Sequence, residues 1–102
     1  MEVIIKNDGQ NVDAQMNGRL DTAAAVAVAA DFDTLKELAD KQIFIDCTQL
    51  DFISSSGLRL LLALRKATLA KGGKMKICNI NEQVRNVFTL TGFSNLFEFG
   101  DK

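Results

Sequence analysis

Midway along the chain the sequence reads Asp51-Phe52-Ile53-Ser54-Ser55-Ser56-Gly57-Leu58-Arg59. This stretch joins a strand-like apolar run to a leucine-rich helical run through three serines and a glycine. Serine is a favoured helix N-cap, and glycine suits a tight strand-to-helix turn. A hydroxyl at a helix start also lies beside unpaired N–H groups and the positive end of the helix dipole, which accommodate a phosphate. Local physics therefore leaves two interpretations open, a helix cap or a phosphorylation site.

The segments on either side of this junction set the middle of the fold. Gln42–Cys47 is short, β-branched and apolar, which predicts a central strand buried on both faces. After the serines we expect a helix from about Ser56 to about Ala70, ended by Gly72 in the left-handed conformation. Lys74–Asn79 is predicted to be the next strand.

The N-terminal part begins with an expected hairpin. Val3–Ile5 and the alternating Val12–Met16 flank an Asp-Gly turn within Asn7–Gln10. Asp21 then offers an N-cap for a helix from about Ala23 to about Ala39, which Asp31-Phe32-Asp33 is expected to bend or divide.

The C-terminal part is predicted to hold one more helix and a short strand. Asn81–Leu90 is amphipathic, with Asn81 as its cap, and Thr91-Gly92 ends it. The alternation in Phe93–Phe99 indicates a last strand.

This order predicts an α/β fold with a mixed sheet, antiparallel in its first pair and parallel in its middle strands, flanked by helices. Residues 1–102 are long enough for a single domain with one core. Because functional loops gather at the carboxyl ends of parallel strands, Gly18–Asp21 and Ser54–Ser56 are expected to share one edge.

Composition narrows the function classes. The 12 basic and 13 acidic residues nearly cancel, which argues against nucleic acid or an anionic membrane as the main partner. The chain has no histidine, so it lacks Ser-His-Asp and Cys-His catalytic groups and an ordinary His-bearing zinc site. Phosphate-loop and dinucleotide-binding motifs are also absent. We expect a protein that is not an enzyme and holds no metal or cofactor.

The remaining composition bears on location. Cys47 and Cys78 lie in apolar stretches without Cys-x-x-Cys spacing, which indicates buried, reduced thiols. The N-terminus lacks the basic start and apolar core of a signal peptide, and no apolar run approaches the roughly 20 residues that cross a bilayer. We therefore expect a cytoplasmic protein with no direct membrane insertion.

Gly18-Arg19-Leu20-Asp21-Thr22, together with Ile45-Asp46 and Phe52–Leu58, resembles the STAS domain, specifically the stand-alone anti-sigma factor antagonists. The similarity spans essentially the whole chain, and the element order matches the mixed sheet and flanking helices of that family. The family's turn typically reads Asp-Ser-Ser-Gly or Asp-Ser-Thr-Gly, whereas here Ser54 stands in place of the aspartate.

The resemblance implies site residues. The hydroxyl two residues before the glycine is the family's phosphorylation site, which is Ser55 here, with Ser56 as the alternative. Asp21 matches the acidic residue of the family's Gly-x-Leu-Asp segment, although it is equally well placed as a helix N-cap. We expect Ser56 to cap the following helix while Ser55 points outward. The implied partner-binding residues are Asp21, Ser54, Ser55, Ser56, Gly57, Leu58 and Arg59.

The resemblance also implies a partner-switching role in transcription regulation. The unphosphorylated protein would bind an anti-sigma factor that is also a serine kinase and so release a sigma factor. Phosphorylation would weaken the complex, and a serine phosphatase would reset it. The alternative is a STAS regulatory subunit of a membrane transporter or lipid-transfer ATPase.

The helix after the turn adds two expectations. Its leucines cover more than half of its circumference, wider than one core face requires, which leaves two interpretations: some contact a partner, or all are buried between the sheet and neighbouring helices. Arg59 and Lys66 are predicted on the solvent side, whereas Arg65 falls among the leucines, with its stem over apolar surface.

Overall fold

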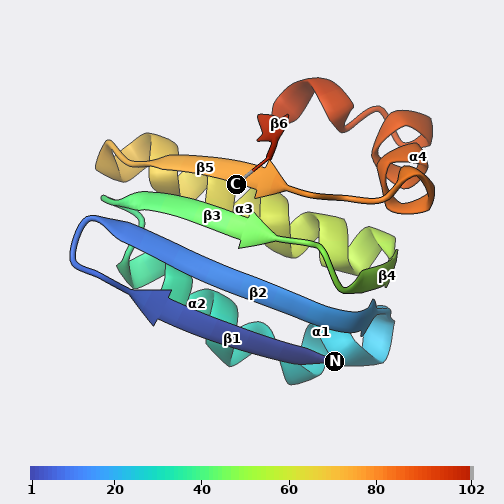
Figure 1. Cartoon of the computed structure of the whole chain (residues 1–102), viewed down its shortest axis with the longest axis horizontal. Helices are drawn as coiled ribbons and strands as arrows, with labels where there is room; N and C mark the ends of the chain where they lie inside the picture. The colour runs from blue at the N-terminus through green and yellow to red at the C-terminus, as the bar shows by residue number, and fades with distance from the viewer. Residues whose placement is uncertain (102) are drawn as a thin grey trace.

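The computed structural model describes residues 1–101, which form a mixed sheet with helices on one of its faces (Figure 1). The strands are β1 (Glu2–Asn7), β2 (Asn11–Leu20), β3 (Gln42–Asp46), β4 (Leu50–Ile53), β5 (Lys74–Cys78) and β6 (Phe99–Gly100). The helices are α1 (Thr22–Ala27), α2 (Ala29–Glu37), α3 (Ser55–Lys71) and α4 (Glu82–Leu90), with a 3-10 turn η1 (Ser94–Leu96).

The strand order is β1-β2-β3-β5-β6, and β4 pairs with the far end of β2. β1 and β2 are antiparallel, whereas the β2–β3, β3–β5 and β5–β6 pairs are parallel. The predicted mixed α/β sheet is thus confirmed. Asp8 stabilises the hairpin turn, because its carboxylate accepts hydrogen bonds from the backbone N–H groups of Asn11 and Gln10, which lower its pKa.

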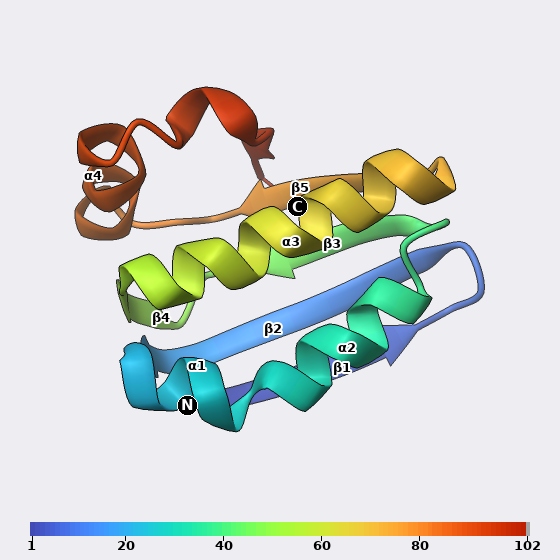
Figure 2. The ribbon, with the colours of Figure 1, turned by 180° about the vertical axis from the view of Figure 1, so that it is seen from behind.

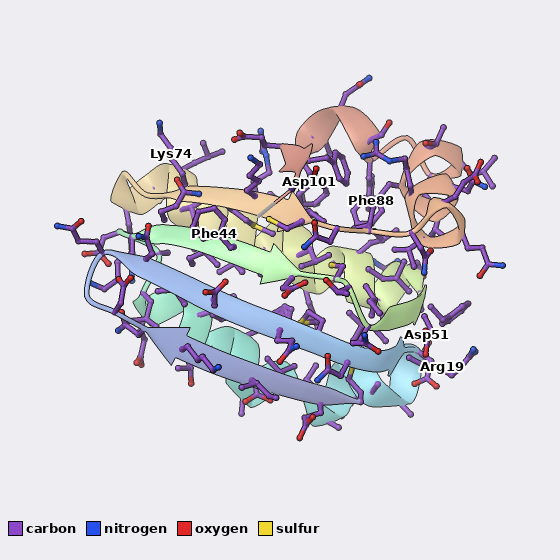
Figure 3. All side chains as sticks on the ribbon, viewed as in Figure 1. Arg19, Phe44, Asp51, Lys74, Phe88 and Asp101 are labelled. Carbon is purple, nitrogen blue, oxygen red and sulfur yellow. The ribbon has the colours of Figure 1, made fainter. Side chains whose placement is uncertain are left out.

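The helices that cover the sheet lie on one of its sides. Figure 2 shows α1, α2 and α3 packed across the back of the strands, while the front face carries no helix. The prediction that the central strand is buried on both faces is therefore wrong. Ile43 and Ile45 of β3 are fully buried against the helices, but Phe44, which Figure 3 shows on the open face, is only half-buried.

Strand β4 was not expected from the sequence. It is four residues long and pairs in parallel with β2 only where a register shift between Gly18 and Arg19 redirects that strand. Leu50 and Ile53 are buried, whereas Asp51 is exposed. The strand holds the end of β2 and the start of α3 together.

The helix expected over 23–39 is two helices, α1 and α2, and the break lies at Val28 rather than at Asp31–Asp33. The backbone leaves the helical conformation at Val28, with φ −98° and ψ 7°. The Val28 side chain is nevertheless buried at 4 % exposure, and Phe32 is fully buried within α2. The break lets both helices keep their apolar sides on the sheet.

The strand expected over Phe93–Phe99 is largely replaced by other structure. Residues 94–96 form η1, and only Phe99–Gly100 pair with β5. The phenylalanines are used for packing instead: the ring of Phe88 in α4 meets those of Phe97 and Phe99 edge to face, at 5.5 and 5.3 Å between centroids. Arg85 lies over the Phe99 ring at 4.7 Å.

The two cysteines lie where the carboxyl ends of β3 and β5 meet. Both are buried and unbridged, as predicted. The backbone N–H of Cys47 donates to the carbonyl of Cys78 at 2.9 Å, which ties the loop after β3 to the end of β5. Burial raises the pKa of the Cys47 thiol to about 12. Among residues 1–101, no helix is both long and apolar enough to span a membrane.

Candidate functional site

The site begins with the pairing of β2 and β4. Arg19 lies opposite Phe52 and Leu20 opposite Ile53, and the backbone N–H of Ser54 donates to the Leu20 carbonyl at 2.8 Å. The prediction that Gly18–Asp21 and the serine turn share one edge is confirmed. Both chain segments then turn directly into helices, so that α1 and α3 start side by side.

Each of these helices is capped by the residue that precedes it. The Asp21 carboxylate accepts a hydrogen bond from the Ala24 N–H at 2.8 Å. The Ser54 hydroxyl accepts one from the Gly57 N–H at 3.2 Å. The expectation that Ser56 caps the second helix is therefore wrong: α3 begins at Ser55, and its cap occupies the position where the family usually has aspartate.

The three serines differ in what their side chains do. Ser54 is half-buried and engaged as the cap, Ser55 is exposed at the first residue of α3, and Ser56 is half-buried at the second. The Ser55 hydroxyl has no hydrogen-bond partner within residues 1–101. Of the three hydroxyls, that of Ser55 is the one most open to another protein.

The next three residues divide between core and surface. Gly57 is buried so closely that a Cβ there would lie 2.7 Å from Leu20 Cγ and 3.0 Å from Ile53 Cγ1. Leu58 is fully buried. Arg59 is exposed. Gly57 and Leu58 thus fix the position of the turn from within, and Arg59 presents a charge beside it.

A shallow groove runs between α1 and the first turns of α3. It encloses about 360 Å³ and is lined by Thr22, Ala25, Val26, Ala29, Ser56, Arg59 and Leu60. Val26 is 77 % exposed, so its apolar side chain is open to contact at this groove. Val26 was not among the residues predicted from the sequence, although its place in an alanine-rich helix capped by Asp21 was the available signal.

Arg19, within the Gly18–Thr22 motif, is a second residue at this edge with no role predicted from the sequence. Its guanidinium lies 4.4 Å from the centroid of the Phe52 ring, a cation–π contact at the outer edge of the β2–β4 pair. Figure 3 shows Arg19 and Asp51 at this end of the molecule, both exposed. The contact holds the exposed guanidinium of Arg19 in place close to the serine turn.

The arrangement offers surface rather than reaction chemistry. Within residues 1–101, no three potential metal-ligating side chains gather in one place. The features at this edge are an exposed hydroxyl, an apolar groove and charged side chains on its rim. Such a mixture is suited to contact with another protein.

Comparison with known proteins agrees with this picture. The model of the STAS domain family matches residues 3–102. The chain is 30 % identical over 92 residues to BtrV of Bordetella bronchiseptica, whose name describes an anti-sigma factor antagonist, with 90 % of this chain and 78 % of BtrV covered.

Two solved structures share the fold. A candidate anti-sigma factor antagonist of Thermotoga maritima aligns with a TM-score of 0.84 at 24 % identity, covering 98 % of this chain and 86 % of that one. The Bacillus cell fate determinant SpoIIAA, in its phosphorylated form, aligns with a TM-score of 0.71 at 22 % identity, covering 96 % of this chain and 90 % of that one.

The chain belongs to the STAS domain family, because the family model and the fold agree over nearly its whole length. Within that family, its sequence places it with the anti-sigma factor antagonists.

Proposed function

We propose that this protein is a phosphorylation-switched antagonist of an anti-sigma factor that also acts as its serine kinase. Unphosphorylated, it binds that partner in the cytoplasm and releases a sigma factor. Phosphorylation of Ser55 weakens the complex, and a serine phosphatase restores it. The observation that supports this most is the exposed Ser55 hydroxyl, at the first residue of α3 and beside the groove between α1 and α3.

Ser55 is favoured over its neighbours by geometry. The Ser54 hydroxyl is half-buried and accepts a hydrogen bond from the Gly57 N–H as the helix cap, whereas Ser55 is exposed and within reach of a kinase. Ser56 lines the groove and is half-buried, so it remains the second candidate. SpoIIAA, which shares this fold, has a solved structure in a phosphorylated form, and this supports the same kind of modification here.

The fold is suited to carry the phosphate without unfolding. A phosphoserine adds roughly two negative charges, and the start of a helix stabilises negative charge through its dipole. The first turn of α3 contains no acidic residue that would repel the group. The effect of phosphorylation therefore falls on the contact surface, where added charge and its desolvation oppose binding.

The same surface indicates what the partner presents. Val26 and Leu60 offer apolar contact in the groove, and Arg59 and Arg19 lie exposed nearby. We expect the partner to insert an apolar side chain between α1 and α3 and to place acidic groups near the two arginines. Asp21, half-buried at the head of α1, borders this surface while it caps that helix.

Phosphopeptide mass spectrometry on the protein from its native cell tests the proposal. The tryptic fragment Gln42–Arg59 contains all three serines, and we expect one phosphate on Ser55. Phosphate on Ser56 would keep the switch and correct the residue. A fragment that stays unmodified across growth and stress conditions would contradict the switch and favour the transporter-subunit alternative.

Binding measurements with the anti-sigma factor that co-purifies with the protein complete the test. Ser55→Asp should bind at least about tenfold more weakly than wild type, as expected for a charge placed in an interface. Ser94→Ala, in η1, is the matched control and should bind as wild type does. A Ser55→Asp variant that binds as tightly as wild type would count against the mechanism.

A further inference from the structure

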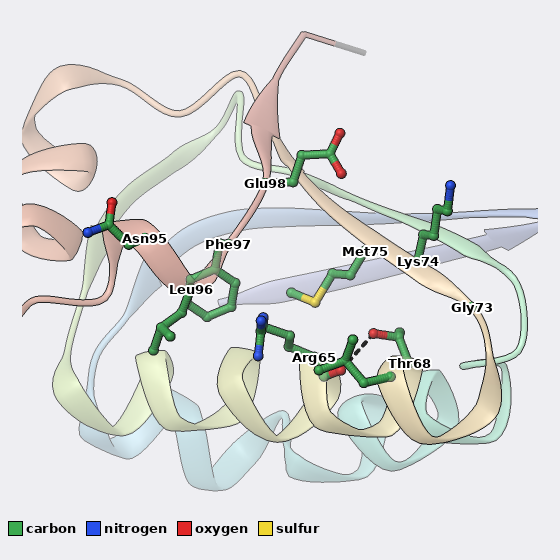
Figure 4. A pocket seen from close by; sticks show the side chains of 10 residues that line it. Arg65, Thr68, Gly73, Lys74, Met75, Asn95, Leu96, Phe97 and Glu98 are labelled. Atoms are coloured by element: carbon green, nitrogen blue, oxygen red, sulfur yellow. Dashed lines mark hydrogen bonds between the residues drawn. The ribbon is translucent and has the colours of Figure 1, made fainter.

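A second hollow lies on the molecule away from the serine turn. It encloses about 400 Å³ between the C-terminal half of α3, the start of β5 and the η1 segment. Its walls are mixed. Leu69 of α3, Met75 of β5, and Leu96 and Phe97 beside η1 form an apolar part, and polar and charged side chains line the rest. Figure 4 shows Met75, Leu96 and Phe97 around a common space, and the hollow is open to solvent.

One cation points into this apolar space. Arg65 extends from α3 toward Met75 and Phe97 in Figure 4. Its side chain is half-buried, whereas the adjacent Lys66 is exposed. The guanidinium makes no ion pair or hydrogen bond with any residue in the range 1–101.

The position of Arg65 makes this lack of a partner informative. It lies one helical turn after Leu61, at the border of the stripe of α3 that packs on the sheet. An aliphatic side chain there would cover the same apolar surface, whereas the guanidinium adds a positive charge and N–H donors beside the apolar part of the hollow. Covering apolar surface with the arginine stem accounts for the stem alone.

We propose that this hollow binds a small organic monocarboxylate. The carboxylate pairs with the Arg65 guanidinium, whose planar fork of N–H donors matches two carboxylate oxygens. The apolar body of the ligand lies against Met75, Leu96 and Phe97. The volume is near the lower end of the roughly 300–1,000 Å³ of ligand pockets, which suits a medium-chain or aromatic acid.

The rim of the hollow restricts the ligand to a single negative charge. In Figure 4 the Lys74 ammonium and the Glu98 carboxylate both point away from the hollow, so Arg65 is the cation that faces it. One cation facing the hollow, beside an apolar wall, suits a monoanion with an apolar body. A polyphosphate would leave most of its charge without a partner.

The test uses the full chain, labelled with ¹⁵N, and follows backbone amide signals by NMR. Octanoate and phenylacetate are titrated to about 10 mM, with octanol as the uncharged probe of equal chain length. We expect shift changes concentrated at Arg65, Met75 and residues 96–98, with octanol bound at least about tenfold more weakly, because the charge-assisted hydrogen bonds are lost.

Variants identify the residue responsible. Arg65→Gln should weaken octanoate binding by about tenfold or more, and Arg65→Lys, which keeps the charge but loses the fork, should weaken it less. Lys66→Gln removes the neighbouring exposed charge and should bind as wild type does. If the NMR spectrum of Arg65→Gln shows that it is unfolded, octanoate binding by Arg65→Lys is compared with that of wild type instead.

Three results would overturn the proposal: no shift changes in the hollow with either acid, equal binding of octanol and octanoate, or undiminished binding by both Arg65 variants. All of these readouts are independent of Ser55, so their outcome bears on this hollow and leaves the proposed switch to its own tests.

Discussion

The two strand-to-helix junctions at the edge of the sheet share one plan but differ in charge and packing. In each, a capping side chain accepts a hydrogen bond from the N–H three residues later: Asp21 from Ala24, and Ser54 from Gly57. At the first junction the cap is a carboxylate and the third helical residue is a half-buried alanine. At the second the cap is a neutral hydroxyl and the third residue is a buried glycine.

The two helix starts therefore differ in how much negative charge they already carry. Asp21 already supplies negative charge to the start of α1, which is six residues long. The start of α3 has neither an acidic cap nor an acidic first turn, and the helix runs for 17 residues. Its N-terminal dipole is therefore left without a compensating side-chain charge, which fits a position that receives a phosphate.

The largest expected effect comes from filling the buried glycine. Gly57→Ala places a Cβ within 3.0 Å of Ile53 and closer still to Leu20, and both of those side chains are at most 1 % exposed. We expect a loss of about 1–3 kcal/mol in the free energy of unfolding, measured by urea denaturation. Ala24→Gly, the matched change in α1, should cost only about 0.5–1 kcal/mol, from backbone entropy. Equal costs at the two positions would contradict the packing difference.

Removing the caps should have the next largest effect. Asp21→Ala should lower the free energy of unfolding by about 1 kcal/mol, because the Ala24 N–H loses its acceptor. Ser54→Ala should cost somewhat less, since its hydrogen bond is longer, at 3.2 Å against 2.8 Å. Asp21→Asn keeps an acceptor oxygen and serves as the control in the same urea series. A larger loss at Ser54 than at Asp21 would reverse the comparison.

Exchanging the cap chemistry should have a smaller effect of opposite sign at the two helices. Ser54→Asp should add about 0.5 kcal/mol by placing a carboxylate at the start of α3, and Asp21→Ser should remove about as much from α1. Thermal unfolding at low and high salt measures both changes. Because the dipole interaction is screened by ions, the difference should shrink at high salt, and a salt-independent difference would argue for packing instead.

The smallest change in stability is expected at the proposed phosphorylation site. Ser55→Ala removes an exposed hydroxyl without a hydrogen-bond partner within residues 1–101, so the free energy of unfolding should change by less than about 0.5 kcal/mol. The same urea series measures it, with Ser54→Ala as the neighbouring comparison. A loss as large as that of Ser54→Ala would indicate that Ser55 supports the helix and would weaken its assignment as a free acceptor.

Features set by local chemistry were predictable from the sequence. The caps at Asp21 and Asn81 and the left-handed end of α3 at Gly72 are confirmed, because each depends on a few neighbouring residues. The mixed sheet followed from alternating elements and from the right-handed connection between parallel strands.

Features that depend on contacts between distant parts of the chain could not be predicted from the sequence. Three consecutive serines are equally able to cap a helix, and the choice of Ser54 is made by β4, whose end at Ile53 places the Ser54 N–H on the Leu20 carbonyl. β4 itself pairs only with the redirected end of β2, which no local pattern reveals. The break at Val28 likewise follows from packing on the sheet rather than from the nearby aspartates.

The buried cysteines allow the local opening of the sheet to be measured through the rate at which they react with a thiol reagent. With the pKa of Cys47 raised to about 12, almost none of that sulfur is thiolate at neutral pH while the chain is folded, so a thiol reagent reacts only after the junction of β3 and β5 has come apart. The rate of labelling therefore measures how often the centre of the sheet opens, with no dye, tag or engineered residue. Comparing this labelling rate with and without phosphate on the serine turn would show whether a change at that edge alters the opening of the centre of the sheet.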